Sequence, residues 1–521
     1  MILVLVVQGK NIRNAVVINN ILMTILKNTI LIIISGILLV LSFPNYNLVT
    51  LSYIFLVPLL ISINKQNKYI CFLFGFLTGM VAYSGIMYWI VPTFIAAGQS
   101  KLLGVLCLLL LSAYCSIYIG IFCIFLNLFN SIKGIYFIFS LSSIWVILEY
   151  IRTYFLSGFP WGVLGYTQWK FLSLIQISEI TGVYGISFLI VFINLAIGKF
   201  VIDKIEFKNK FKYILCTSLI FVFCILYGYL RLNLFQSGNN SKSINVVCLQ
   251  GNIDQYKKWD KKYQKEIINT YTMLINKSMK TNPDLIIWPE SSVPGYLLNE
   301  IDLYNYIREI IKKSKCYHII GSVVYNKSKF YNSAILFSKE GNPIEIYSKV
   351  HLVPFGETIP FKPFLSKYIK VLNELGDFTS GRDYKIFHIK GCDLGINICY
   401  ESIFPEISRK ITKKGAEILV NITNDAWYLR TSAAQQHFIF NIFRAIENRR
   451  TVIRCANTGI TGFIDKYGRI NKKTEIFSTL ILEAVVNTNK FETIYTKFGD
   501  IFIFLCIFNF IISFIYANKL F

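Results

Sequence analysis

The distribution of apolar residues divides the chain into a part with long uncharged runs and a part of mixed composition. Eight runs of roughly 20 residues are long and apolar enough to cross a bilayer as helices. They lie at 28–43, 48–63, 69–92, 101–126, 134–156, 177–198, 213–234 and 499–518. We therefore expect an N-terminal membrane domain of about seven transmembrane helices over 1–235, a globular domain over 240–495, and a C-terminal transmembrane helix over 499–518.

Within the globular part, short apolar runs alternate with amphipathic segments. Strand-like runs occur at 244–250, 284–288, 317–324, 394–399 and 416–422. Helix-like segments occur at 259–280, 301–313 and 435–449. Strands that alternate with helices along a chain usually form layers of helices on sheets. The pattern therefore predicts an α/β fold for this domain.

Lysine and arginine are unevenly distributed between the two sets of loops that connect the predicted spans. They are concentrated in the segments that share a side with the N-terminus, whereas the opposite short loops carry only Lys101, Arg152 and Lys170. Positive charge favours the cytoplasmic side. We expect both termini in the cytoplasm and, in a bacterial inner membrane, the globular domain in the periplasm.

Charge and cysteine content exclude some functions. The net charge is +24, but the basic residues form no stripe interleaved with aromatic residues, so nucleic-acid binding is not expected. The chain has 12 cysteines without a CxxC pair, and its 4 histidines are scattered. We therefore predict no metal site, and we expect no other cofactor.

The clearest chemical signal lies at Cys399. The apolar run 394–399 reads as a buried strand that ends at this cysteine, and a helix-like segment, 402–414, follows. Amide groups at the start of a helix favour a thiolate, so a cysteine at such a turn can serve as a nucleophile. A buried, unreactive cysteine is the alternative, because cysteine is common in protein cores.

Two other strand ends carry groups that could act with this thiol. Glu290 follows the apolar run 286–288, and Lys349 follows the run 344–348. If these ends meet at one edge of a sheet, the site would combine a carboxylate base, a cation and a thiol. His437 offers a different thiol partner, but we expect it to be a structural, hydrogen-bonding histidine.

Several motifs in this order resemble those of the apolipoprotein N-acyltransferase family, a membrane-embedded branch of the nitrilase, or carbon-nitrogen hydrolase, superfamily. They extend over about 28–518 and include the motifs Trp288-Pro289-Glu290-Ser291, Tyr347-x-Lys349, Leu352-Val353-Pro354-Phe355-Gly356-Glu357, Ile398-Cys399-Tyr400-Glu401, Asn424-Asp425-Ala426-Trp427 and Gly158-Phe159-Pro160-Trp161. The superfamily as a whole shares the Glu, Lys and Cys pattern. The membrane spans and the Gly158 loop narrow the resemblance to the acyltransferases.

The resemblance implies a four-layer αββα nitrilase-like domain inserted between transmembrane helices. It implies that Cys399 is the nucleophile, Glu290 the general base and Lys349 the oxyanion stabiliser. The implied reaction moves a fatty acyl chain from a phospholipid, through a thioester on Cys399, to the α-amine of a lipoprotein's N-terminal S-diacylglyceryl-cysteine. The implied partners are therefore the phospholipid donor, the diacylglyceryl apolipoprotein acceptor and the bilayer, and we expect a monomer.

The resemblance also assigns supporting residues. Glu357, Glu401 and Tyr400 match positions that support the three catalytic residues, and Trp259 matches a position tied to substrate contact. The structural alternative is a salt bridge or a cap for each glutamate, packing against the cysteine turn for Tyr400, and an exposed aromatic residue at a helix start for Trp259. One departure is visible at 428–434, Tyr-Leu-Arg-Thr-Ser-Ala-Ala, where the family usually has an aromatic residue, Gly and a Gly-Pro pair. It puts the loop shape or the acceptor preference in question.

Two other functions compete with acyl transfer. A membrane-tethered amidase with water as the acceptor would use the same three residues, but seven spans are more than an anchor requires. A transporter or receptor would need no reactive thiol, and the spans hold few ionisable residues.

A loop between the motifs is a candidate lid. Residues 355–378 are rich in Phe, Pro, Leu and Tyr, which a soluble enzyme would bury or avoid in a loop. We expect this segment to dip to the bilayer, and charging Phe361 and Phe364 would test the idea.

Overall fold

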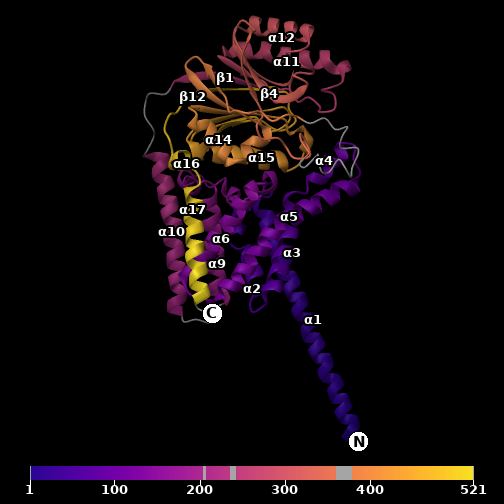
Figure 1. Ribbon diagram of the computed structural model, residues 1–521, viewed down its shortest axis with the longest axis vertical. Helices are drawn as coiled ribbons and strands as arrows, with labels where there is room; N and C mark the ends of the chain where they lie inside the picture. The colour runs from indigo at the N-terminus through magenta and orange to yellow at the C-terminus, as the bar shows by residue number, and fades with distance from the viewer. Residues whose placement is uncertain (1, 203–206, 235–241, 360–377, 520–521) are drawn as a thin grey trace.

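A computed structural model describes residues 2–202, 207–234, 242–359 and 378–519. Long helices form a bundle below a domain of two β-sheets with helices on both outer faces (Figure 1). The α/β class predicted for the globular domain is confirmed. Phe361 and Phe364 of the predicted lid lie outside the described residues.

The bundle contains the apolar runs read from the sequence. Its helices are α1 (Ile2–Ser42), α2 (Leu56–Ile63), α3 (Lys68–Ile86), α4 (Ile90–Ala96), α5 (Lys101–Leu128), α6 (Ile135–Tyr154), α7 (Leu172–Ile175), α8 (Ser178–Thr181), α9 (Tyr184–Ile202), α10 (Phe207–Asn233) and α17 (Ile501–Lys519). Within the described residues, seven helices are long and apolar enough to cross a membrane. The last helix, α17, returns from the globular domain and packs along α6 (Figure 1).

The run 48–63 departs from the expected single apolar helix. It forms a 3₁₀ turn, η1 (Val49–Tyr53), followed by the short α2. At the break, the Asn194 side chain accepts a hydrogen bond from the Leu56 amide (2.9 Å) and donates one to the Ser52 carbonyl (2.8 Å). A helix can break at membrane depth where neighbouring side chains satisfy the freed backbone groups. The sequence could not show this break, because the satisfying amide lies on the distant α9.

The chain from 44 to 67, which contains the broken run, nevertheless extends along the full length of α3. The Gln436 side chain of the globular domain donates to the carbonyls of both Pro44 and Ile86, each at 3.1 Å. Both ends therefore lie at the same level, against the globular domain. Asn67 caps the opposite end of α3. The chain between 44 and 67 thus runs antiparallel to α3 over the same depth.

Two six-stranded sheets form the globular domain. The first has the order β12-β1-β2-β3-β4-β5, with β1 (Ser243–Gln250), β2 (Leu285–Ile287), β3 (Tyr317–Asn326), β4 (Lys329–Phe337), β5 (Pro343–Ser348) and β12 (Leu480–Asn487). The second has the order β11-β10-β9-β8-β7-β6, with β6 (Ile386–Ile389), β7 (Cys392–Ile398), β8 (Ile418–Thr423), β9 (Thr451–Ala456), β10 (Gly462–Ile464) and β11 (Ile470–Lys473). β1, β2 and β3 are parallel, as are β7, β8 and β9.

Side chains that alternate in direction along the buried strands contribute to two separate hydrophobic cores. On β1, Val246 and Cys248 pack into the core between the sheets, whereas Val247 and Leu249 pack under α11 (Gln264–Ser278) and α12 (Ile301–Ser314). Successive side chains of a strand point to opposite faces, so each buried strand serves two layers.

The helices below the second sheet join the domain to the bundle. They are α14 (Pro405–Lys413), α15 (Ala433–Asn448) and α16 (Ile494–Phe498). The apolar side chains of α14 and α15 form one continuous core with those of the membrane helices. The α15 helix lies between the second sheet and the bundle (Figure 1), and it positions much of the site described next.

Candidate active site

Cys399 stands at a sharp turn at the carboxyl end of β7. The five residues Cys399–Ile403 form a 3₁₀ turn, and α14 follows. The backbone φ of Cys399 is +53°, in the left-handed region that costs a non-glycine residue on the order of 1–3 kcal/mol. Its side chain is buried, with 9% of its surface exposed. The predicted strand, turn and helix are present, and the strained cysteine projects its thiol from the turn.

Glu290 and Lys349 reach the same place from the other sheet. Glu290 follows β2, and Lys349 follows β5. The Lys349 ammonium lies 3.7 Å from the Glu290 carboxylate, and the charges of both groups act on the nearby Cys399 thiol. The structure therefore brings together the three residues that the sequence predicts.

Glu357 and Asn332 complete the polar surroundings of the thiol. The Glu357 carboxylate lies 2.8 Å from the Lys349 ammonium. The Asn332 amide, on β4, donates to Glu290 and to Glu357, in both cases at 2.7 Å. We call Glu290, Asn332, Lys349 and Glu357 the thiol-side cluster. Sequence reasoning missed Asn332, whose only signal is an amide within an apolar strand.

The charges of this cluster divide unequally. Burial lowers the pKa of Lys349, but Glu357 and Glu290 outweigh burial and raise it. Burial raises the pKa of Glu357, but Lys349 more than reverses the effect. Burial raises the pKa of Glu290 above its usual value, with Lys349 opposing and Glu357 assisting the rise. Lys349 and Glu357 are therefore the settled ion pair, and Glu290 is the carboxylate with the greater affinity for a proton.

The thiol itself is held in its protonated form. Burial raises the pKa of Cys399, the Glu290 carboxylate adds to the rise, and Lys349 opposes it. A thiol in this state needs a base at the moment of attack. Glu290 is the carboxylate beside this thiol and can take the proton.

Glu401 has a different task from Glu357. Its carboxylate accepts hydrogen bonds from the Tyr347 hydroxyl (2.8 Å) and from the backbone amides of Val350 (2.7 Å), His351 (3.1 Å) and Ile398 (2.7 Å). These groups flank Lys349 on one sheet and Cys399 on the other. Glu401 therefore ties the lysine segment to the cysteine turn through their backbones.

A second polar group lies behind the cysteine. The His437 ring, fully buried on α15, places Nε2 3.2 Å from the Cys399 carbonyl oxygen and Nδ1 2.9 Å from Asp425. Arg454 lies 2.7 Å from the same aspartate, and Asn421 donates to the Cys399 carbonyl at 3.3 Å. We call Asn421, Asp425, His437 and Arg454 the carbonyl-side network. The expected structural histidine is present, and its contact is with the backbone of Cys399.

Comparison with known proteins follows the two parts of this architecture. Residues 35–196 match the family described as the apolipoprotein N-acyltransferase N-terminal domain, and residues 245–489 match the carbon-nitrogen hydrolase family. A Geobacter metallireducens protein named apolipoprotein N-acyltransferase is 37% identical over 494 residues, which cover 92% of this chain and 93% of that protein. The chain belongs to the apolipoprotein N-acyltransferase family. The family predicted from the motifs is thereby confirmed.

Further relatives of the acyltransferase agree. An apolipoprotein N-acyltransferase of Wigglesworthia glossinidia brevipalpis is 34% identical over 506 residues, 93% of this chain and 97% of that protein. Among solved structures, a carbon-nitrogen hydrolase from Helicobacter pylori G27 superposes with a TM-score of 0.37 and 18% identity, covering 47% of this chain and 88% of that one.

Two residues predicted to support the acyltransferase site contact residues outside the thiol-side cluster. The Tyr400 hydroxyl donates to the Gly158 carbonyl of the bundle at 3.4 Å. Trp259 is 48% exposed, and its ring lies 6.0 Å from that of Tyr296. Its neighbour Lys258 is buried instead, and the Lys258 ammonium donates to the Glu290 carbonyl at 3.4 Å. Burial lowers the pKa of Lys258 to about 8. Sequence reasoning missed this buried cation.

The atypical loop at 428–434 packs against the bundle. The Tyr428 ring lies 5.0 Å from that of Trp89 and 6.1 Å from that of Trp161. The Arg430 guanidinium lies over the Phe477 ring at 4.7 Å. Edge-to-face aromatic contacts therefore hold the start of this loop in the absence of the usual Gly and Gly-Pro residues.

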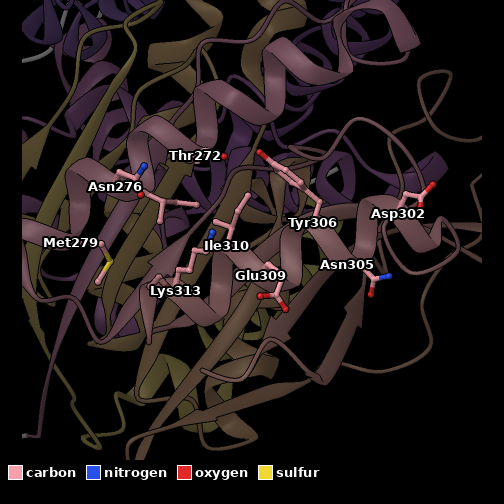
Figure 2. Close-up of a pocket in the computed structure, with 11 residues that line it drawn as sticks. Thr272, Asn276, Met279, Asp302, Asn305, Tyr306, Glu309, Ile310 and Lys313 are labelled. Atoms are coloured by element: carbon pink, nitrogen blue, oxygen red, sulfur yellow. The ribbon is translucent and has the colours of Figure 1, made fainter.

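An open groove of the acyltransferase lies well apart from this chemistry. It has a volume of about 560 Å³ and runs between α11 and α12, on the face away from the bundle (Figure 1). Figure 2 shows Asn276 of α11 and Tyr306, Glu309 and Lys313 of α12 along it. None of the groups around Cys399 lines this groove. In the described part of the chain, no cluster of three or more His, Cys, Asp or Glu could hold a metal ion.

Proposed function

We propose that this acyltransferase moves a fatty acyl chain from a phospholipid to the α-amine of an N-terminal S-diacylglyceryl-cysteine on a lipoprotein. The observation that carries the proposal is that the Cys399 thiol lies beside Glu290 and Lys349, directly above a membrane bundle. A nucleophile, a base and a cation at the membrane suit acyl transfer from a lipid.

In the first half-reaction, Glu290 takes the thiol proton as Cys399 Sγ attacks the ester carbonyl carbon. A carbon–sulfur bond forms, and the carbonyl electrons move to the oxygen beside the Lys349 ammonium. The tetrahedral intermediate then expels the ester oxygen, which receives the proton from Glu290. The products are a lysophospholipid and a thioester on Cys399.

In the second half-reaction, the acceptor amine attacks the thioester carbon and gives its proton to Glu290. An amide bond forms, the carbon–sulfur bond breaks, and the thiolate regains the proton. Glu357 supports both halves by fixing Lys349 through their ion pair of 2.8 Å. Burial of the thiol limits attack by water, which favours the amine as acceptor.

The arrangement in the membrane is also a proposal. The N-terminal membrane domain spans 1–235, the catalytic domain 240–495 and the C-terminal helix 499–518. The distribution of basic residues between the loops favours a catalytic domain in the periplasm of a bacterial inner membrane and both termini in the cytoplasm. We expect a monomer, with Trp259 at the surface that meets the substrate. Reporter fusions at the C-terminus and within 242–260 would test the orientation.

Intact-mass spectrometry after incubation with phospholipid alone tests the reaction. The wild-type protein should gain the mass of one acyl chain, and hydroxylamine should remove it because thioesters are labile to this reagent. The Cys399→Ser variant should gain no such hydroxylamine-labile mass. Cys392→Ser, on the same strand, is the matched control and should behave as wild type.

The outcomes separate the competing functions. A labile adduct on Cys399 that passes to a diacylglyceryl peptide supports the proposal. Hydrolysis of small amides without an adduct from phospholipid would favour a tethered amidase. No adduct and no turnover of either substrate would favour a binding protein.

A further inference from the structure

The carbonyl of Cys399 is held as firmly as its thiol. Three side chains are directed at this single oxygen: Ser402 Oγ at 3.0 Å, His437 Nε2 at 3.2 Å and Asn421 Nδ2 at 3.3 Å. The carbonyl and the thiol-bearing Cβ are attached to the same Cα, in a tight turn where φ is +53°, so hydrogen bonds that hold the carbonyl also restrict the position of the thiol. Groups that fix the carbonyl therefore fix the aim of the nucleophile.

The surroundings of His437 assign a hydrogen to its Nε2. The Cys399 carbonyl can only accept, and Ser402, the other neighbour of Nε2 at 3.3 Å, already donates its hydroxyl hydrogen to that carbonyl. The Arg454 guanidinium, 3.1 Å from Nδ1, can only donate, which favours Nδ1 as the acceptor and therefore the hydrogen on Nε2. The mechanism above makes no use of this buried donor, which cannot reach the reacting atoms except through the backbone.

The other side of the ring is fixed equally well. Nδ1 lies 2.9 Å from Asp425 and 3.1 Å from Arg454. Arg454 also donates to Asn421 at 2.8 Å, so one guanidinium braces two of the three side chains that hold the carbonyl. A Cβ at Gly459 would lie 2.0 Å from the Asp425 carboxylate, which shows how little space surrounds it.

The residue before His437 connects the same helix to the bundle. The Gln436 side-chain oxygen accepts hydrogen bonds from the indoles of Trp161 (2.7 Å) and Trp89 (3.2 Å). Two consecutive residues of α15 thus bind the membrane helices on one side and the nucleophile's backbone on the other.

We propose that His437 is a positioning residue that holds the Cys399 turn in its strained conformation by donating to the Cys399 carbonyl, and that it thereby makes the thiol's aim depend on the docked membrane bundle. The inference rests on the proposed function for the nature of the acyl donor. The orientation of the buried Cys399 thiol does not depend on which acyl donor is used.

The test compares His437→Leu with His437→Gln in the full-length protein in phosphatidylethanolamine–phosphatidylglycerol micelles. Two rates are measured: thioester formation on Cys399 and alkylation of Cys399 by iodoacetamide. The leucine variant should slow both at least about 10-fold, because a small displacement of a reacting group can cost up to 100-fold. The glutamine variant keeps a side-chain N–H donor and should recover most of both rates. The leucine effect should fall on kcat, with KM for the lipid nearly unchanged.

Asn448→Ala is the matched control, since Asn448 is equally buried on α15 but bonds Arg444 and Thr496 instead. It should leave both rates within about twofold of wild type. Near-wild-type rates in a folded leucine variant would overturn the proposal, and so would equal losses in the leucine and glutamine variants or in Asn448→Ala. If the wild type forms no thioester, the proposed function fails, while the alkylation rates still decide the role of His437.

Discussion

The thiol-side cluster and the carbonyl-side network both converge on Cys399, but they balance charge in different ways. On the thiol side, Lys349 pairs with Glu357 at 2.8 Å and only approaches Glu290, at 3.7 Å. On the carbonyl side, Asp425 lies against Arg454 and His437, and all three side chains are fully buried. The first group keeps one carboxylate available for proton transfer. The second keeps its charges paired, as expected of a group that preserves shape.

Replacing Glu290 by Gln should break the thiol side most severely. The amide keeps the shape but cannot accept the thiol proton, so thioester formation should fall by about 10²–10⁴-fold. Rapid-quench measurement of the acyl-enzyme gives the rate. Glu309→Gln, an exposed carboxylate on α12, is the control and should behave as wild type. A Glu290→Gln rate within tenfold of wild type would remove Glu290 from the role of base.

Lys349→Met should cause the second-largest loss in the rate of thioester formation. Loss of the cation removes the group placed to stabilise the oxyanion, which should slow thioester formation by about 10²–10³-fold. It also leaves two buried carboxylates side by side, so the melting temperature should fall. Lys390→Met, which breaks an exposed ion pair with Asp284, should change neither property by much. Normal turnover in Lys349→Met would contradict the assignment.

The pH profile should distinguish Glu290 from Glu357. Glu290 acts in its ionised form, and its pKa is raised, so the rate of thioester formation should be lost as the pH falls through a value above that of an ordinary glutamate. Replacing Glu357 by Gln removes a negative neighbour of Glu290, so this acid limb should move to lower pH, while the rate at its plateau falls about tenfold. An unchanged or upward-shifted limb would show that another group controls the profile.

Glu401→Gln should affect stability more than chemistry. The amide would turn an N–H group toward one of the four donors that Glu401 binds, which should destabilise the fold by about 1–3 kcal/mol. Denaturant unfolding would measure the change, and the rate per folded molecule should fall less than tenfold. A loss as large as that of Glu290→Gln would place Glu401 in the chemistry.

The groove between α11 and α12 should give the smallest effect. Tyr306 lines it and is 47% exposed, so Tyr306→Ala should leave thioester formation within about twofold of wild type. A larger loss in this variant would extend the functional region to the outer face of the domain.

The sequence was sufficient to predict that Glu290, Lys349 and Cys399 lie close together, because each stands next to an apolar run. Glu290, Lys349 and Cys399 all follow strands, and strand ends of one sandwich can share an edge. Asn332 was missed because it lies within a strand and joins the site only through the fold. The role of His437 was out of reach for another reason: its partner is a backbone carbonyl, whose direction depends on one dihedral angle of Cys399.

The membrane domain shows the same limit. The sequence predicted long apolar helices correctly where a run forms one helix, as in α5 and α17. It could not predict the break in 48–63, since the compensating side chain, Asn194, comes from a helix more than a hundred residues away.

The shared core of α14, α15 and the bundle has a consequence for the design of shortened forms. A fragment cut at 242 and 495 would leave the membrane-facing side of α15 without its apolar neighbours. It would also leave Gln436 without Trp89, Trp161, Pro44 and Ile86, and Tyr400 without Gly158. Such a fragment would expose an apolar, aggregation-prone surface to water. It would need polar substitutions on this face to remain in solution. The globular domain therefore depends on the membrane bundle to cover its apolar lower face.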